Sequence, residues 1–389
     1  MTREYRVISA DSHLEVAGDR WAARVPAKYR DLAPRRVKLP NGGEVQVMGS
    51  QSNIEPRRTF RKGYDQRAGT FEDNDGAGTP EKRLQEQDED GIDAEVLFPG
   101  TNGCTKLLRN GLTDDEAYKA MVRAYNDWLA EDYCSVAPDR LIGVGLLPEV
   151  DLDSAIDELE HCARLGLKGV QLDAFPSAEV YPTPEDDRFY AACVDMNMPL
   201  CAHIGLHQSR GGEIKPLFKY SKSEDTSLMK STGRDPITKF MLHGRPPSRD
   251  IVRLVFAGVF DRFPTLNMYF AETQAGWVPY WLERLDDAYH RDHPFAHEVW
   301  GLPKLDRLPS EIVKEHIWWG FTNDGFGVES RYHIGVDHMM WESDFPHDIS
   351  SFPHSCEVID TIFKGVPEDE RAKMLAKNCT KFFHLDEVA

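Results

Sequence analysis

Six side chains that can bind a metal ion lie at or just past the ends of apolar, strand-like segments. They are Asp11 and His13 in VISADSH, His203 in PLCAH, Glu272 in LNMYFAE, and Glu342 and Asp344 in MMWESD. Two imidazoles with several carboxylates form a hard, oxygen-rich ligand set, which suits Zn²⁺, Mn²⁺ or Fe²⁺ better than a thiolate site would. The residue types therefore predict a divalent metal centre and metal-assisted chemistry.

Four of these residues form two pairs with the same spacing. Asp11 and His13 are two residues apart, as are Glu342 and Asp344, so each pair would project the same way from an extended strand end. Alone, each pair is weak evidence, because D-x-H is often a surface feature and the acidic pair could be a solvated turn before Pro346. Burying several carboxylates together is costly without a counter-charge. A divalent ion supplies that charge, so the combination favours a metal site.

Strand-like and helix-like patterns alternate along the chain. We expect strands at residues 7–9, 94–100, 140–148, 169–175, 199–205, 266–272, 316–321 and 336–344. We expect helices at residues 80–93, 114–135, 151–166, 187–197, 248–264, 278–290 and 368–378. This order implies an α/β fold with a parallel, fully covered sheet. We predict a single (β/α)8 TIM-type barrel over residues 1–389, with long loop insertions at about 16–79 and 206–247, and with its catalytic groups at the carboxyl ends of the strands.

Composition and charge exclude several other classes of protein. The chain is 41% hydrophobic, enough for a sizeable core, but its apolar runs fall far short of the roughly 20 residues of a membrane helix. A net charge of −19 without a basic stripe argues against nucleic-acid binding. The opening MTREYRVISADSH lacks a secretory signal core, and the seven scattered cysteines contain no CxxC pair. We expect a cytoplasmic protein with a small-molecule substrate and no nucleic-acid or membrane partner; a homodimer stays an open alternative.

Several motifs, in this order and spacing, resemble the amidohydrolase superfamily. They are VISADSHLEV, DEDGIDAEVLFPG, YNDWLAEDYCSVAPDRLIGVGLLP, GLKGVQLD, VFAGVFDRFPTLNMYF, GWVPYWLERLD and WESDFPH, and they cover nearly the whole chain. The resemblance is to the amidohydrolase-2 branch, which includes aminocarboxymuconate-semialdehyde decarboxylase and γ-resorcylate decarboxylase. It implies that Asp11, His13 and His203 are metal ligands. It also implies that Asp344 binds metal and can serve as a base.

Glu272 marks a departure from that branch, whose members usually carry a histidine at the end of strand six. A carboxylate there would repel a substrate carboxylate unless it binds metal itself. The strand-four segment carries Gln171 and Asp173 and no lysine, which argues against a carbamylated-lysine bridge between two metals.

Three functions follow from this ligand set. The first is a metal-dependent hydrolase or decarboxylase (a lyase) acting on a small carboxylated or carbonyl substrate. It would use one Zn²⁺ or Mn²⁺, with Asp344, Glu272 and His207 as catalytic groups. The alternative is a non-heme diiron monooxygenase on the same barrel, in which Glu272 and Glu342 help to hold two iron ions and the substrate is a natural product, acyl- or CoA-linked. The third is a barrel that has lost catalysis and only binds a ligand.

Other residues near these motifs are candidates for substrate contacts or for orienting the ligands. Glu15 lies two residues beyond His13, although a turn or capping role fits it equally well. His347 in FPH could orient Asp344, because a hydrogen bond from a neighbouring group commonly fixes a metal ligand. Trp277 could form a wall of the substrate pocket.

Overall fold

The computed structural model describes residues 3–40, 42–48, 51–53, 70–72, 74–100, 108, 111–177, 179, 181–206 and 247–386. Eight parallel strands pair in chain order: β1 (Ile8–Leu14), β5 (Ala94–Pro99), β6 (Leu141–Leu146), β7 (Gly169–Gln171), β8 (Leu200–His203), β9 (Met268–Ala271), β10 (Ile317–Phe321) and β11 (Met339–Trp341). A parallel bridge between Ser12 and Phe345 joins the last strand to the first. The predicted (β/α)8 barrel is therefore confirmed.

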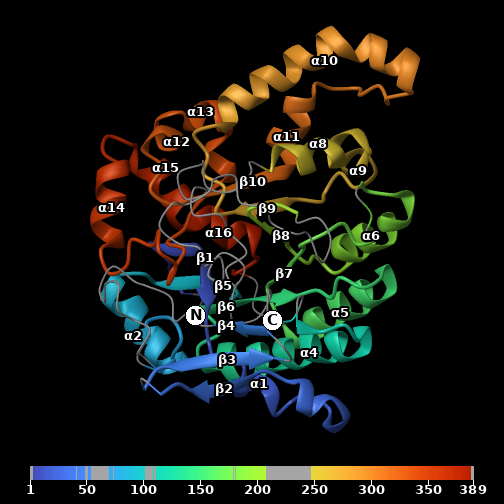
Figure 1. Cartoon of the computed structure of the whole chain (residues 1–389). Coiled ribbons are helices and arrows are strands. Elements are labelled where there is room, and N and C mark those ends of the chain that lie inside the picture. The colour runs from blue at the N-terminus through green and yellow to red at the C-terminus, as the bar shows by residue number, and fades with distance from the viewer. Residues whose placement is uncertain are drawn as a thin grey trace, which may run out of the picture.

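Helices surround the strands (Figure 1). The helices of the barrel layer are α2 (Pro80–Asp90), α4 (Asp115–Trp128), α5 (Leu152–Leu165), α6 (Asp187–Asp195), α8 (Ser248–Phe256), α9 (Val259–Arg262), α10 (Val278–Trp300) and α11 (Pro309–His316). Shorter helices follow: α12 (Gly325–Glu329), α13 (Arg331–Ile334), α14 (Ser355–Ile362), α15 (Glu368–Ala372) and α16 (Asn378–Phe382). No helix in the described part of the chain is long and apolar enough to cross a membrane.

Local sequence signals fix the ends of two helices, α2 and α5, whose observed ranges are near the predicted ones. The side chain of Thr79 caps α2 by accepting a hydrogen bond from the Lys82 N–H, and Gly91 ends this helix in the left-handed conformation. Helix α5 begins after Asp151, which accepts from the Ser154 N–H, and ends at Gly166 with φ 79°. These caps account for the close agreement between the predicted and observed ranges of the two helices.

The interior of the barrel is filled by alternate strand residues. Ile8, Ala10, Val96, Val144, Cys201, Tyr269, Trp318 and Met340 form one buried cluster with Phe382 and Phe383, which come from the end of the chain. In β1, however, the pairing with β5 shifts register between Ser9 and Ser12. A bulge of this kind changes which side chains point inward. It lets Asp11 and His13 continue the inward-facing row that begins with Ile8 and Ala10.

Several elements differ from the sequence prediction. Strand β1 runs to Leu14, well beyond the predicted end at residue 9, so the Asp11–His13 pair lies within the strand. Helix α10 continues to Trp300 instead of ending near residue 290, passes through Pro294, and extends past the barrel at the top of Figure 1. The predicted helix at 248–264 is two helices, because Gly258 adopts a left-handed φ of 67° between them.

The chain between β1 and α2 has structure of its own. It contains α1 (Asp19–Ala22), the 3₁₀ helix η1 (Ala27–Leu32), and an antiparallel sheet of β2 (Arg35–Lys38), β3 (Glu44–Met48) and β4 (Gln51–Asn53). This part of the chain was predicted only as a long loop insertion at 16–79. Most of the second predicted insertion, residues 207–246, lies outside the described residues.

Candidate metal centre

Four of the predicted ligands converge at the carboxyl ends of three strands. One ligand atom from each of Asp11, His13, His203 and Asp344 lies within 4.8 Å of the others, and all four side chains are buried. The Nε2 atom of His13 is 3.4 Å from Asp11 Oδ1 and 3.3 Å from Asp344 Oδ1. The Nε2 atom of His203 is 3.5 Å from Asp11 Oδ2. Three segments far apart in the sequence thus bring two imidazoles and two carboxylates to one point.

The chemistry of this set fits a divalent cation. The Nε2 atoms of His13 and His203 face each other at 2.9 Å. Neither carboxylate oxygen of Asp11 accepts a well-aligned hydrogen bond, although Asp11 is fully buried. Buried charges of one sign that lack donors are costly, and a metal ion is the usual compensation. The facing imidazole nitrogens and the carboxylate without donors are what a cation among these four side chains would bind.

The imidazole of His13 is held in an orientation suited to metal binding. Its Nδ1 lies 3.2 Å from the carbonyl oxygen of Pro99, so the proton belongs on Nδ1 and the lone pair of Nε2 faces the other ligands. The ring stacks on that of His347, with centroids 4.0 Å apart and planes 15° apart. Burial, and then the nearby His347, lowers the pKa of His13, which favours the neutral, metal-binding form.

The backbone is left-handed at three positions around this centre. Ile204, Glu272 and Asp344 have φ values of 63°, 56° and 51°, and each follows a different barrel strand. Residues other than glycine in this region cost about 1–3 kcal/mol each, and such residues cluster at functional sites. Here the turns redirect the chain just after His203, at Glu272 itself and at Asp344 itself.

Glu272 lies at the edge of the four-residue set. Its Oε2 is 3.3 Å from His203 Nε2, and together with Asp344 and His347 it forms a second, overlapping group whose ligand atoms lie within 4.8 Å of one another. Burial, and then the negative charge of Asp344, raises the pKa of Glu272 to about 7. For His203, burial lowers the pKa but the carboxylates of Asp11 and Glu272 outweigh it and raise the value to about 9. A bound cation would lower both values.

His347 links two of the predicted carboxylates. Its Nδ1 is 2.8 Å from Asp344 Oδ1, and its Nε2 is 3.1 Å from Glu15 Oε1. Burial alone would raise the pKa of Asp344, but His347 and His13 together lower it well below its usual range. The structure thus brings His347 and Glu15 to the centre, where they form a chain of contacts behind Asp344.

Glu342 points away from the four-residue set and belongs to neither candidate group. Its Oε2 accepts a hydrogen bond of 2.6 Å from the Tyr269 hydroxyl, and its Oε1 accepts one of 2.8 Å from the backbone N–H of Glu272. Gly320 of β10 leaves the space for this contact, since a Cβ there would collide with the Glu342 carboxylate. Burial, and then the charge of Asp11, raises the pKa of Glu342 well above its usual value. Glu342 therefore supports the backbone of Glu272 from inside the barrel.

Two predicted residues remain, Trp277 and His207. The indole N–H of Trp277 donates to the carbonyl oxygen of Thr273 at 3.0 Å, and its ring packs against Trp281 and Trp319. These contacts place Trp277 in the packing of α10 against the barrel. His207 lies outside the described residues.

Comparisons with known proteins agree with this architecture. The family model described as Amidohydrolase (Amidohydro_2) matches residues 64–385. The chain belongs to the amidohydrolase family. A curated relative of this amidohydrolase, the γ-resorcylate decarboxylase of Rhizobium sp. (strain MTP-10005), is 22% identical over 323 residues, which cover 78% of this chain and 86% of the relative.

Solved structures of similar fold cover as much or more of the chain. The amidohydrolase map2389c of Mycobacterium avium subsp. paratuberculosis K-10 has a TM-score of 0.71 and 21% identity, covering 98% of this chain and 100% of its own. The 5-carboxyvanillate decarboxylase of Novosphingobium aromaticivorans was crystallised with manganese and 4-hydroxy-3-methoxy-5-nitrobenzoic acid. It has a TM-score of 0.60 and 22% identity, covering 78% and 79% of the two chains.

These findings confirm the predicted resemblance to the amidohydrolase-2 branch. The relatives and structural neighbours that are named as decarboxylases support the prediction of an enzyme of the hydrolase or decarboxylase kind. None of them favours the diiron monooxygenase.

One group of residues in this amidohydrolase was not predicted from the sequence. Arg83 of α2 and Glu95 of β5 form a buried ion pair directly behind β1. The available signal was Glu95 itself, a charged residue inside the apolar run AEVLFPG. A charge in a buried strand requires a partner of opposite charge. Here that partner is Arg83 of the adjacent helix α2.

Removing the hydrogen bond between Tyr269 and Glu342 tests whether Glu342 has a structural role inside the barrel. We expect Tyr269→Phe to lower the stability of this amidohydrolase by about 1–3 kcal/mol, because the Glu342 carboxyl group stays buried and loses one partner. Metal content should be unchanged, since Glu342 lies outside the four-residue set. Thermal unfolding and elemental analysis measure the two effects. Loss of metal in this variant would show that Glu342 takes part in metal binding.

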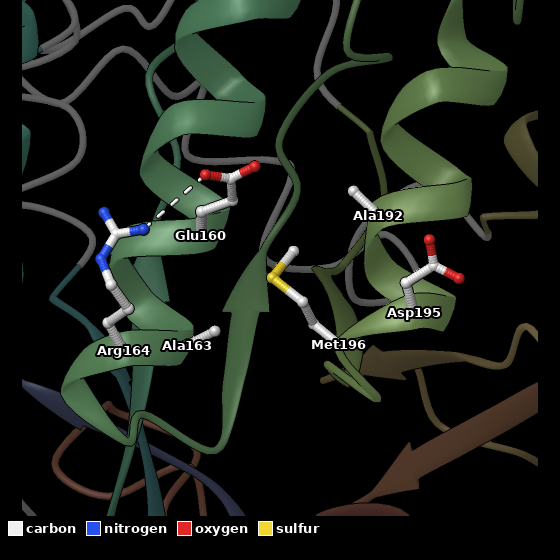
Figure 2. Close-up of a pocket in the computed structure, with 6 residues that line it drawn as sticks. All are labelled: Glu160, Ala163, Arg164, Ala192, Asp195 and Met196. Atoms are coloured by element: carbon white, nitrogen blue, oxygen red, sulfur yellow. Dashed lines mark ion pairs between the residues drawn. The ribbon is translucent and has the colours of Figure 1, made fainter.

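A hollow on the outer surface is unrelated to this centre. It lies between α5 and α6 and is lined by Glu160, Ala163, Arg164, Ala192, Asp195 and Met196 (Figure 2). Glu160 and Arg164 form an ion pair of 3.7 Å along α5 at one side of it. Because its lining residues come from the helical layer and include none of the candidate ligands, we assign it no part in the chemistry.

Proposed function

We propose that this amidohydrolase catalyses the metal-dependent, non-oxidative decarboxylation of a small carboxylated substrate. The observation that carries the proposal is the convergence of Asp11, His13, His203 and Asp344 on one point at the carboxyl end of the barrel. These residues would hold one divalent cation, and Mn²⁺ or Zn²⁺ suits their mixture of imidazole and carboxylate ligands. The relatives named as decarboxylases, and the manganese bound to one structural neighbour, support this choice.

The residues of the chain divide the work of such a reaction. A divalent cation, when bound, supplies positive charge that polarises a substrate oxygen or activates water. His13 and His203 present neutral nitrogen ligands, and Asp11 and Asp344 balance the charge. During decarboxylation the bond between carbon and the carboxylate breaks, its electron pair stays on the carbon, CO₂ leaves, and the carbon takes up a proton. Glu272, 3.3 Å from His203, is placed to give that proton.

Hydrolysis of a carbonyl substrate is the second candidate, because the same ligand set can activate water. The buried carboxylates favour it, since Asp344 or Glu272 could take a proton from that water. The two reactions differ in product: only decarboxylation releases CO₂. A homodimer and a cytoplasmic location stay predictions from the sequence.

Metal removal tests the proposal directly. We expect the protein, purified without added metal, to contain one divalent ion per chain, and dialysis against a chelator to abolish activity that Mn²⁺ or Zn²⁺ then restores. γ-Resorcylate and 5-carboxyvanillate are the first probes, with release of CO₂ as the readout. Chelator-treated protein and heat-denatured protein are the controls.

Three results would contradict the proposal. A preparation that binds no Mn²⁺ or Zn²⁺ would remove its basis. Hydrolysis of an ester, amide or lactone without release of CO₂ from any carboxylated probe would favour the second candidate. Consumption of O₂ with substrate would show oxidative chemistry instead.

A further inference from the structure

A buried ion pair lies behind the strand that carries two of the candidate ligands. Arg83 Nε donates to Glu95 Oε2 at 2.6 Å and Arg83 Nη2 to Glu95 Oε1 at 3.2 Å. The two side chains are 1% and 3% exposed. Removing both charges from water is costly, so a pair buried this deeply is weak evidence for a gain in stability. Its position suggests a different role.

The other donors of Arg83 reach the ligand segments themselves. Arg83 Nη1 donates to the carbonyl oxygen of His13 at 3.0 Å, and Nη2 approaches the carbonyl oxygen of Phe345 at 3.4 Å. The guanidinium lies over the ring of Phe345, 4.5 Å from its centroid. Glu95 in turn accepts a hydrogen bond of 2.9 Å from the Ser12 hydroxyl. The pair therefore holds residues adjacent to, or identical with, three of the four candidate ligands.

These contacts fall where the barrel closes through an isolated bridge instead of a regular strand pair. In the described chain, β1 and the segment after β11 are joined by an isolated bridge between Ser12 and Phe345. The His13 N–H donates to Phe345 O at 2.7 Å, and the Asp344 N–H donates to Asp11 O at 3.0 Å. On its other side, β1 shifts register against β5 between Ser9 and Ser12. Backbone pairing alone therefore constrains the junction between β1 and the segment after β11 less than it constrains the regular strand pairs of the barrel.

We propose that Arg83 is a positioning residue for the metal centre. By joining the backbone of His13 to that of Phe345, next to Asp344, it fixes the separation of ligands that come from the first and last strands. Metal ligands must be held within about 0.2 Å of their ideal distances. The inference rests on the proposed function only in taking Asp11, His13, His203 and Asp344 as the ligands.

The test is metal affinity, measured without substrate. The single variant R83M would leave the Glu95 carboxylate buried without a counter-charge, which is strongly destabilising. The double variant R83M/E95Q removes both charges and keeps an acceptor for the Ser12 hydroxyl. We expect it to fold, as judged by circular dichroism and thermal unfolding, and to bind Mn²⁺ about 10- to 100-fold more weakly, in line with the loss of other groups that orient ligands. Electron paramagnetic resonance of free Mn²⁺ gives the dissociation constant. The single variant R83K keeps Glu95 and supplies a positive charge and at least one donor. It should therefore bind Mn²⁺ more tightly than R83M/E95Q and more weakly than the unaltered protein.

A matched ion pair away from the centre separates positioning from general stability. Arg331 Nε donates to Glu370 at 2.6 Å, and the Arg331 guanidinium lies 4.3 Å from the ring of Tyr332. R331M should lower the unfolding temperature but leave the Mn²⁺ affinity unchanged. A folded R83M/E95Q variant with the affinity of the unaltered protein, or an equal loss of affinity in R331M, would overturn the inference and leave the proposed function standing. If the unaltered protein binds no Mn²⁺, the proposed metal site fails and the inference falls with it.

Discussion

Asp344→Asn is expected to reduce kcat/KM by at least about 10³-fold, a loss typical of removing a group that acts on the reacting atoms. It should also weaken metal binding. Asp344 is the residue shared by both candidate groups, and its Oδ1 lies 3.3 Å from His13 Nε2 and 2.8 Å from His347 Nδ1. Asparagine removes a negative charge and places an amide N–H₂ where a lone pair is required. Both the cation and His347 lose their shared partner.

This substitution isolates chemistry from folding unusually well. Asparagine has almost the same shape as aspartate and tolerates the left-handed backbone that Asp344 adopts at φ 51°. Asp90→Asn is the matched control, because Asp90 is also buried but accepts its hydrogen bonds from Ser355, away from the centre. Activity assays and elemental analysis should separate the two variants. Full activity and full metal content in Asp344→Asn would show that the site is misplaced.

The residue types and their positions after apolar runs predicted six candidate ligands, and the resemblance to the amidohydrolase-2 branch implied the four that converge. His203 ends a run of apolar residues, and Asp344 follows another, so barrel topology alone brings them to the same end. The pair Asp11 and His13 was expected from its two-residue spacing, but the strand that holds it was predicted too short. The shift of register inside β1 is a tertiary feature of its pairing with β5, and it leaves no mark in the local pattern.

Glu342 shows why spacing alone does not define a ligand. It has the same spacing to Asp344 as Asp11 has to His13, yet its carboxyl group turns to the Tyr269 hydroxyl and the Glu272 N–H. The difference arises because Tyr269, on a strand some 70 residues earlier, projects its hydroxyl into the same layer of the barrel interior. Likewise, the burial of Arg83 was not predicted, because an arginine on a helix is normally a surface residue. Both cases depend on contacts between distant segments, which the sequence pattern does not contain.

Glu272→Gln is expected to retain one metal ion per chain and to lower kcat by about 10²- to 10⁴-fold, the usual contribution of a general acid or base. Glu272 lies outside the four-residue set but 3.3 Å from its member His203. Glutamine keeps the size of the side chain and removes the proton that the substrate carbon must receive. KM should change little, because the cation and its four ligands remain.

Glu342→Gln is the matched control for this substitution, since Glu342 is also a buried glutamate of the barrel interior, and it contacts the backbone of Glu272 without joining either candidate group. Its kcat should stay far closer to that of the unaltered protein than that of Glu272→Gln. If Glu272→Gln instead loses its metal, Glu272 is itself a ligand of the metal centre. If it keeps both metal and activity, the proton comes from another group, and His347, whose Nδ1 lies 2.8 Å from Asp344 Oδ1, becomes the donor to test. The metal content and kcat of Glu272→Gln thereby decide whether Glu272 is a ligand or a proton donor.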